Sequence, residues 1–180
     1  MQKTAIKTAD LAYMALMAAF ISICAWISVP TTVPFTMQTF AICVAGGLLG
    51  AKRGALTVFA YVLLGAIGLP VFSGMTGGIG QLFGTTGGYL IGFIILGGVT
   101  GFFAERFDNT AGSFAGMIIG NILCYVFCTA WYMVLYTAKT GAVGLMTVLG
   151  WCVFPFIISD ILKMLLALVV LRAVKPRVHI

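Results

Sequence analysis

Six apolar blocks, interrupted by short charged or glycine-rich segments, restrict the fold of this chain more than any other feature. The blocks are Leu11 to Val29, Met37 to Gly50, Gly54 to Leu69, Gly87 to Ala104, Ser113 to Tyr136 and Val148 to Val174. A helix needs about 20 apolar residues to cross the hydrocarbon core of a bilayer, and four blocks approach or exceed that length. Only 8% of the 180 residues are charged, whereas soluble domains average about 25%. We therefore predict an all-α integral membrane protein whose six transmembrane helices form one bundle, a single domain over residues 1–180.

The second and third blocks are too short to cross a bilayer upright. We expect these two helices to be short, tilted or flanked by re-entrant backbone. The stretch from Pro70 to Thr86, which follows them, mixes apolar residues with many glycine, serine and threonine residues. Irregular backbone at membrane depth is tolerated only where protein buries it or where it lines a cavity. The sequence therefore predicts a long, partly re-entrant loop between the third and fourth helices.

Basic residues are distributed very unevenly between the two sides of such a bundle. If the N-terminus is inside, the segments on the inner side hold Lys3, Lys7, Lys52, Arg53, Arg106, Arg172, Lys175 and Arg177. The outer loops then hold only Lys139. Because basic residues are retained in the cytoplasm, both termini are predicted to be cytoplasmic. The net charge of +6 is explained by this asymmetry and by an anionic inner leaflet, so it does not call for nucleic acid as a partner.

The cysteines and the histidine do not form the pattern of a metal site or a catalytic site. The five cysteines lie in or near apolar blocks without the spacing of a metal site, and the single histidine, His179, is in the C-terminal tail. The spans also lack paired carboxylates and a Walker-type nucleotide loop. We expect the cysteines to pack in the core, no metal or cofactor to be bound, and binding rather than catalysis to be the function.

Small residues recur at four-residue spacing in two runs, Gly46/Gly50/Gly54 and Gly112/Gly116/Gly120. This spacing lets membrane helices approach closely, and we favour internal packing as its role. Ala15 and Ala19 form a similar small face on the first span. That face could pack inside the bundle or dock against another membrane subunit, and the residues alone leave both options open.

Asp160 and Lys163 are two charges inside the last apolar block, three residues apart. A charge near the centre of a membrane helix costs about 2.5 to 3.5 kcal/mol, so the pair requires mutual attraction, a water-filled cavity or a polar ligand. The fifth span carries a polar face that includes Asn121 and Tyr125. If the two faces meet, they enclose a pocket suited to a small, partly apolar ligand with hydrogen-bond donors and acceptors. The alternative is an internal salt bridge that binds nothing.

Several motifs occur along the chain in a specific order. They are Val33 to Phe40 (VPFTMQTF), Gly46 to Ala55 (GGLLGAKRGA), Tyr61, Gly65 to Phe72 (GAIGLPVF), Gly77-Gly78, Thr86 to Phe93 (TGGYLIGF) and Pro155 to Lys163 (PFIISDILK). Together they closely resemble the BioY family over essentially the whole chain. Members of this family are the biotin-specific substrate-binding subunits, or S components, of energy-coupling-factor vitamin transporters. The resemblance implies six helices in a prokaryotic cytoplasmic membrane, both termini inside, and a vitamin pocket towards the outer face.

The resemblance also implies which residues form the pocket. It places Asp160 and Lys163 at the biotin site, where the ureido ring presents two N–H donors and one carbonyl acceptor. We expect Asp160 to accept from the ring, and Lys163 to donate to its carbonyl or to fix Asp160. Tyr89 and Asn121 are expected to face the same pocket. For Gln38, contact with the ligand and a structural bond to loop backbone are equally favoured.

Groups other than arginine must bind the carboxylate of biotin, because every arginine lies on the predicted cytoplasmic side. We expect backbone N–H groups around Gly77 and Gly78, hydroxyls such as those of Ser73, Thr76 and Thr86, or Lys163 to bind it.

By the same resemblance, the partners are biotin, a transmembrane coupling subunit and two ATPase subunits. Family members meet the coupling subunit through the face that carries Ala15 and Ala19. Three alternatives remain open at this point: an S component for another vitamin, a solitary biotin carrier that works without ATPases, and a structural subunit of a membrane complex.

Overall fold

The computed structural model describes residues 7–31, 33–107 and 109–177, so the predictions that involve Lys3 and His179 lie outside the described residues. The elements are α1 (Thr8–Trp26), β1 (Ser28–Val29), β2 (Phe35–Thr36), α2 (Gln38–Ala66), η1 (Ser73–Met75), α3 (Ile79–Leu82), α4 (Gly87–Arg106), α5 (Thr110–Thr140), α6 (Leu145–Cys152), α7 (Phe154–Val174) and η2 (Lys175–Arg177). In the described ranges, five helical stretches are long and apolar enough to cross a membrane. The prediction of a helical, multi-pass membrane protein is confirmed at this level.

Gly50 divides α2 into two halves. Its φ of +81° and ψ of −177° lie outside the helical region, in a conformation open to glycine because it has no Cβ. The halves fold back on each other, since a Cβ built on Gly54 would lie 2.9 Å from the Cα of Gly46. In a straight helix, eight residues would separate these two by about 12 Å. The second and third predicted spans are therefore the two halves of α2, but the break expected at residues 51–53 is a fold at Gly50 without a separate loop.

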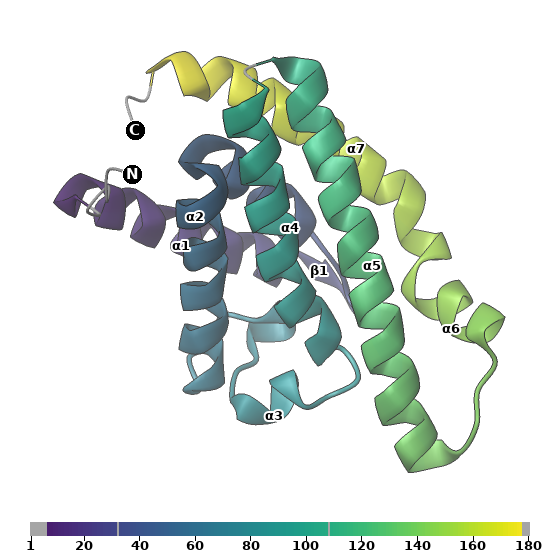
Figure 1. Cartoon of the computed structure of the whole chain (residues 1–180). Helices are drawn as coiled ribbons and strands as arrows, with labels where there is room; N and C mark the ends of the chain where they lie inside the picture. The colour runs from purple at the N-terminus through teal and green to yellow at the C-terminus, as the bar shows by residue number, and fades with distance from the viewer. Residues whose placement is uncertain (1–6, 32, 108, 178–180) are drawn as a thin grey trace.

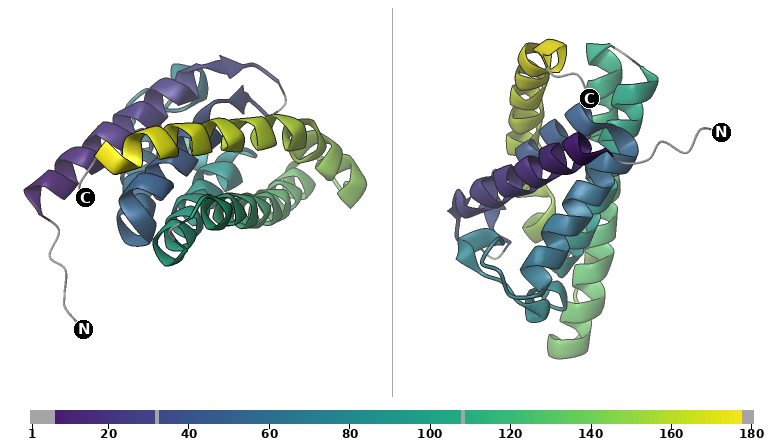
Figure 2. Two further views of the ribbon diagram at one scale, coloured as in Figure 1. Left: turned by 90° about the horizontal axis from the view of Figure 1, so that it is seen from above. Right: turned by 90° about the vertical axis from the view of Figure 1, so that its left-hand side faces the viewer.

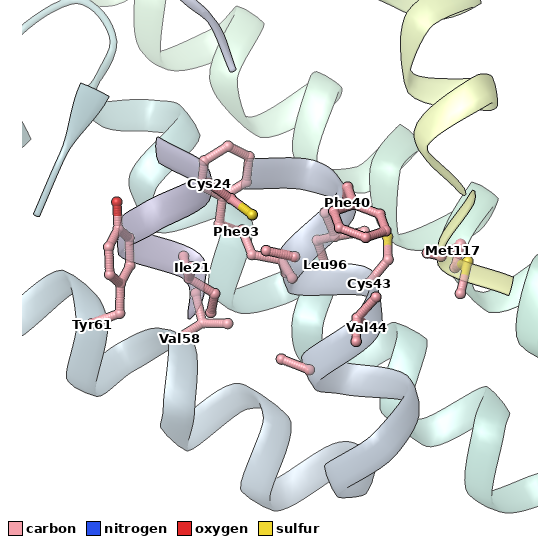
Figure 3. Close-up of a cluster of buried hydrophobic side chains, with 14 of the residues drawn as sticks. Ile21, Cys24, Phe40, Cys43, Val44, Val58, Tyr61, Phe93, Leu96 and Met117 are labelled. Carbon is pink, nitrogen blue, oxygen red and sulfur yellow. The ribbon is translucent and has the colours of Figure 1, made fainter. Parts of the chain in front are cut away.

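The main core lies where α1, both halves of α2, α4, α5 and α7 meet, and Figure 3 shows part of it. Ile21, Phe40, Val58, Leu96 and Met117 come from different segments and belong to one cluster of buried side chains. All five cysteines are free and buried, which confirms core packing as their structural setting. Burial of this apolar cluster fixes the position of α2 and α4, the helices that carry part of the candidate site.

Glycines let α4 pack closely against α2 and α5. A Cβ on Gly46 would lie 2.5 Å from the carbonyl oxygen of Gly97, and a Cβ on Gly116 would lie 2.4 Å from the Cβ of Phe103. Figures 1 and 2 show α4 and α5 side by side, running in opposite directions, while α1 and α7 cross the bundle at a marked inclination. The predicted role of the glycine runs in internal helix packing is confirmed by these approaches.

Polar contacts near one end of the bundle involve basic side chains. Arg53 forms an ion pair with Asp10 at 3.4 Å, which connects the fold in α2 to the start of α1. The Nε of Arg172 donates to the hydroxyl of Thr110 at 3.1 Å, which connects the end of α7 to the start of α5. The end of α7 and the start of α5 lie at the top of Figure 1, and α3 lies at the bottom.

The loop of residues 67–86, between α2 and α4, covers the other end of the bundle and contains η1 and α3. Two indole groups hold its ends. Trp26 Nε1 donates to the carbonyl of Pro70 at 2.8 Å, and Trp131 Nε1 donates to the carbonyl of Gly84 at 3.1 Å. The loop is thereby attached to α1 at its start and to α5 at its end.

Candidate functional site

A cavity of about 260 Å³ lies between the segment around β2, the start of α2, the loop of residues 67–86, α4 and α7. Its apolar walls are made by Val33, Pro34, Phe72, Leu90, Phe93 and Phe156. Its polar groups come from Thr36, Gln38, Thr39, Ser73, Thr76, Gln81, Thr86, Tyr89, Asp160 and Lys163. Apolar walls with a few convergent polar groups are typical of a site for a small organic ligand.

Asp160 and Lys163 form a buried ion pair in the wall of this cavity. Lys163 Nζ donates to Asp160 Oδ1 at 2.8 Å, and the two residues are only 6% and 3% exposed. The three-residue spacing on α7 puts both side chains on one face of the helix. Lys163 Nζ also lies 4.1 Å from the ring centroid of Phe35, a cation–π distance. An ammonium has three donors, so this arrangement leaves Lys163 able to donate to a ligand acceptor.

The second oxygen of Asp160 is held from α5. The hydroxyl of Tyr125 donates to Asp160 Oδ2 at 2.6 Å, and Asn121 Nδ2 lies 3.5 Å from the same oxygen. The polar faces of α5 and α7 therefore meet, as the sequence predicts. Two carboxylate oxygens provide about four acceptor positions, so Asp160 keeps the capacity to accept from a ligand in addition to these donors.

A chain of hydrogen bonds runs from the cavity wall to the covering loop. Thr36 Oγ1 donates to Gln38 Oε1 at 2.8 Å, and Gln38 Nε2 donates to the hydroxyl of Tyr61 at 2.8 Å. The hydroxyl of Tyr61 then donates to the carbonyl of Val71 at 3.0 Å. Each of these groups has a partner, and the chain fixes the amide of Gln38 where it lines the cavity.

Tyr89 lines the cavity from the first turn of α4. Its hydroxyl donates to the carbonyl of Cys152 at the end of α6. Its ring lies 6.3 Å from that of Phe156, with an interplanar angle of 49°. The aromatic face of Tyr89 is therefore part of the wall, while its hydroxyl is engaged by the protein.

The sequence matches the family model described as the BioY family over residues 1–180. The chain belongs to the BioY family. It is 40% identical over 146 residues to "Biotin transporter BioY" of Thermotoga maritima, covering 81% of this chain and 73% of the relative. It is 34% identical over 177 residues to "Biotin transporter BioY2" of Lactococcus lactis subsp. cremoris, covering 96% of this chain and 94% of the relative.

A solved structure supports the same family assignment. The crystal structure of the S-component for biotin from an ECF-type ABC transporter matches with a TM-score of 0.84 and 30% identity, covering 98% of this chain and 95% of that one. The fold of this BioY-family chain is therefore that of a solved S component.

The structure brings seven of the side chains predicted for the site to the cavity wall: Asp160, Lys163, Tyr89, Gln38, Ser73, Thr76 and Thr86. Asn121 is different, because it contacts Asp160 but is not part of that wall. Their roles in ligand binding stay predictions.

The two glycines predicted for carboxylate recognition lie outside the cavity wall. The N–H of Gly78 donates to the carbonyl of Gly65 at 2.7 Å, so that donor is occupied in this conformation. Gly77 has no room for a side chain, because a Cβ there would lie 2.3 Å from the carbonyl oxygen of Leu69. The hydroxyl of Thr76 is engaged in the same way, since it donates to the carbonyl of Ser73 at 2.9 Å. The geometry therefore favours the hydroxyls of Ser73 and Thr86 over the N–H of Gly78 for an anionic ligand group.

Ala15 and Ala19 lie outside the cavity. Both are exposed on α1, and they line an apolar groove between α1 and the second half of α2. Their exposure agrees with an outward face on the helix. Contact with another subunit stays a prediction.

The sequence did not indicate a role for Phe35 in the site, and it placed Tyr125 on the polar face of α5 without identifying its bond to Asp160. Phe35, which lies under the ammonium of Lys163, belongs to the VPFTMQTF motif, but no periodic pattern connects it to α7. Tyr125, which bonds to Asp160, follows Asn121 by four residues on the polar face of α5. That spacing was the available signal for Tyr125.

Proposed function

We propose that this chain is the biotin-binding S component of an energy-coupling-factor transporter and mediates biotin uptake. The observation that carries the proposal is the buried pair of Asp160 and Lys163 in the wall of a cavity of about 260 Å³. Membership of the BioY family supports biotin as the ligand. The match to the S-component for biotin supports the same assignment over nearly the whole chain.

The chemistry of the pair suits the ureido ring of biotin. The carboxylate of Asp160 accepts from a ring N–H, and the ammonium of Lys163 donates to the ring carbonyl. The ring would then replace water at both charges without leaving either one unpaired, which matters because an unpaired buried charge is costly. Phe156 and Phe93 provide apolar surface for the rest of the bicycle.

The loop of residues 67–86 would hold the carboxylate tail. The hydroxyls of Ser73, Thr76 and Thr86 lie in the wall of the cavity on or beside that loop. Because Thr76 donates its one hydroxyl hydrogen to the carbonyl of Ser73 at 2.9 Å, the donors that we assign to the tail are Ser73 and Thr86. Hydroxyl donors can bind a carboxylate without adding a buried positive charge. The site binds its ligand and returns it unchanged, and we assign it no chemical step.

The orientation and the partners form part of the same proposal. Residues 1–180 act as one membrane unit in the cytoplasmic membrane, with both termini inside and the cavity towards the outside, as the distribution of basic residues favours. A transmembrane coupling subunit and two ATPase subunits supply the energy for release. The exposed face of Ala15 and Ala19 contacts the coupling subunit.

A calorimetric titration tests the ligand assignment. The protein is purified in detergent, freed of endogenous vitamin and titrated with biotin, thiamine and riboflavin in turn. We expect saturable one-to-one binding of biotin and no heat of binding with the other two vitamins. Binding of thiamine or riboflavin in its place would assign the chain to another vitamin, and a folded sample that binds none of them would contradict a binding function for the cavity.

A further inference from the structure

Tyr125 and Asn121 reach Asp160 from the side away from the cavity. Both contact the same carboxylate oxygen, Oδ2, and neither lines the cavity. They line instead a separate apolar groove of about 670 Å³ between α5, α6 and α7. A ligand in the cavity therefore meets Asp160, while Tyr125 and Asn121 lie behind it.

The two oxygens of Asp160 are held by donors from different helices. Lys163 on α7 holds Oδ1 at 2.8 Å, and Tyr125 on α5 holds Oδ2 at 2.6 Å. A hydroxyl bonded to a carboxylate at such a distance makes a strong, charge-assisted hydrogen bond. The terminal torsion of an aspartate side chain is broad and imposes little orientation by itself. The two donors together therefore fix the plane of the carboxylate.

We propose that Tyr125 is a positioning residue that orients Asp160 for the ligand without touching it. The inference rests on the proposed function, because the ligand that it favours is the one that Asp160 binds. Preorganisation of this kind raises affinity by removing the cost of ordering the acceptor during binding. Asn121, at 3.5 Å, makes the weaker contact and contributes less.

The position of Tyr125 also separates Asp160 from the apolar groove. The groove is lined almost entirely by apolar side chains, among them Ile122, Val126, Ile157 and Ile161. Without the hydroxyl of Tyr125, Asp160 Oδ2 would lose its closest donor and would face the apolar groove. The hydroxyl therefore also contributes to stability, and only a measurement of affinity distinguishes its positioning role from that contribution.

A double-mutant cycle on biotin affinity makes this distinction. The variants are Tyr125→Phe, Asp160→Asn and the double variant, and each keeps nearly the original side-chain shape. Because the carboxylate of Asp160 must then be ordered during binding, Tyr125→Phe should weaken biotin binding by about three- to tenfold. In the Asp160→Asn background the same change should have less than about a twofold further effect, because the group through which Tyr125 acts has been altered. Equal losses in both backgrounds, or no loss in either, would overturn the proposal.

Tyr132→Phe provides the matched control. Tyr132 is also buried on α5, and its ring stacks on Tyr136 with the centroids 5.6 Å apart. The described residues offer its hydroxyl no hydrogen bond comparable to that of Tyr125. We expect this variant to bind biotin like the unmodified protein, and a loss equal to that of Tyr125→Phe would overturn the proposal by showing a general effect of tyrosine replacement.

Infrared spectroscopy of the ligand-free protein separates a failure of this inference from a failure of the proposed function. The chain has four acidic residues, so the carboxylate bands are few. Tyr125→Phe should shift the carboxylate stretch of Asp160, and Tyr132→Phe should not. If the unmodified protein binds no biotin, the proposed function fails, and the infrared result still decides whether Tyr125 orients Asp160. Unchanged carboxylate bands in Tyr125→Phe would overturn the positioning role whatever the ligand.

Discussion

Gln38, at the start of α2, donates through Nε2 to the hydroxyl of Tyr61, which follows it by 23 residues, at a distance of 2.8 Å. In a straight helix these residues would be about 35 Å apart, so this hydrogen bond joins the two halves of α2 that fold at Gly50. The hydroxyl of Tyr61 donates onward to Val71, in the loop that covers the cavity. A residue in the cavity wall is thereby connected to the covering loop through a buried tyrosine.

Replacing Tyr61 with phenylalanine tests this connection. The change keeps the ring but leaves Gln38 Nε2 without its acceptor and the carbonyl of Val71 without its donor. We expect a loss of about 1 to 3 kcal/mol in the free energy of unfolding, the usual cost of a buried polar group left unsatisfied. Denaturant unfolding of the ligand-free protein measures it. Tyr13→Phe on α1, where the ring is only half-buried, is the control and should change stability little.

The charge pair in the cavity predicts a second stability effect. Lys163→Met leaves Asp160 buried without its cation, and breaking a buried pair in this way costs about 3 to 5 kcal/mol. A double variant, Asp160→Asn with Lys163→Met, leaves no uncompensated charge and should recover most of that loss. Thermal unfolding without biotin compares the two. Equal destabilisation of the single and double variants would show that the pair does not act as a unit.

Two neighbouring glycines of α4 predict opposite responses to alanine. A Cβ on Gly101 would lie 2.3 Å from the backbone carbon of Gly50, whereas a Cβ on Gly98 would lie 3.4 Å from the Cβ of Ala55. Gly101→Ala should destabilise the protein by about 1 to 3 kcal/mol, because backbone must move. Gly98→Ala should be neutral or stabilising by about 0.5 to 1 kcal/mol, since alanine favours a helix. Melting temperatures of the two variants would rank them, and the reverse order would contradict the packing of α4 on the fold in α2.

The exposed alanines of α1 predict a loss of assembly without a loss of binding. Ala19→Trp should prevent co-purification with a coupling subunit, because a large side chain fills the small face of the helix. Biotin affinity of the isolated chain should stay unchanged, since Ala19 lies outside the cavity. Val169→Trp, a substitution at an exposed position on α7, serves as the control and should preserve assembly. Loss of biotin binding in Ala19→Trp would instead indicate a role for this face in the bundle itself.

The apolar blocks predict the helices of this fold because the length of a membrane span is dictated by the bilayer. The fold at Gly50 is only partly visible in the sequence. Lys52 and Arg53 mark a break there, but charge alone does not distinguish a loop from one glycine with positive φ. The contact between Gly46 and Gly54 is a consequence of tertiary packing, and four-residue spacing does not identify the partner helix.

Part of the candidate site could likewise be predicted from the sequence, and part of it could not. Asp160 and Lys163 could be found because a charge inside an apolar span needs a physical reason. Tyr125 lay on a predicted polar face, yet which oxygen of Asp160 it meets depends on the rotation of α5 against α7. Phe35 could not be assigned, because the segment around β2 reaches Lys163 only through the three-dimensional fold.

Biotin affinity measured side by side for the unmodified protein and Asp160→Asn tests the central claim most directly. Asparagine keeps the shape of the side chain but removes the charged acceptor for the ureido N–H. If Asp160 holds the ring, the variant should fold and should bind biotin more weakly by about 1.5 to 3 kcal/mol, the contribution of a hydrogen bond to a charged group. Equal affinity of the two folded proteins for biotin would remove Asp160 from the binding site and contradict the proposed recognition of the vitamin.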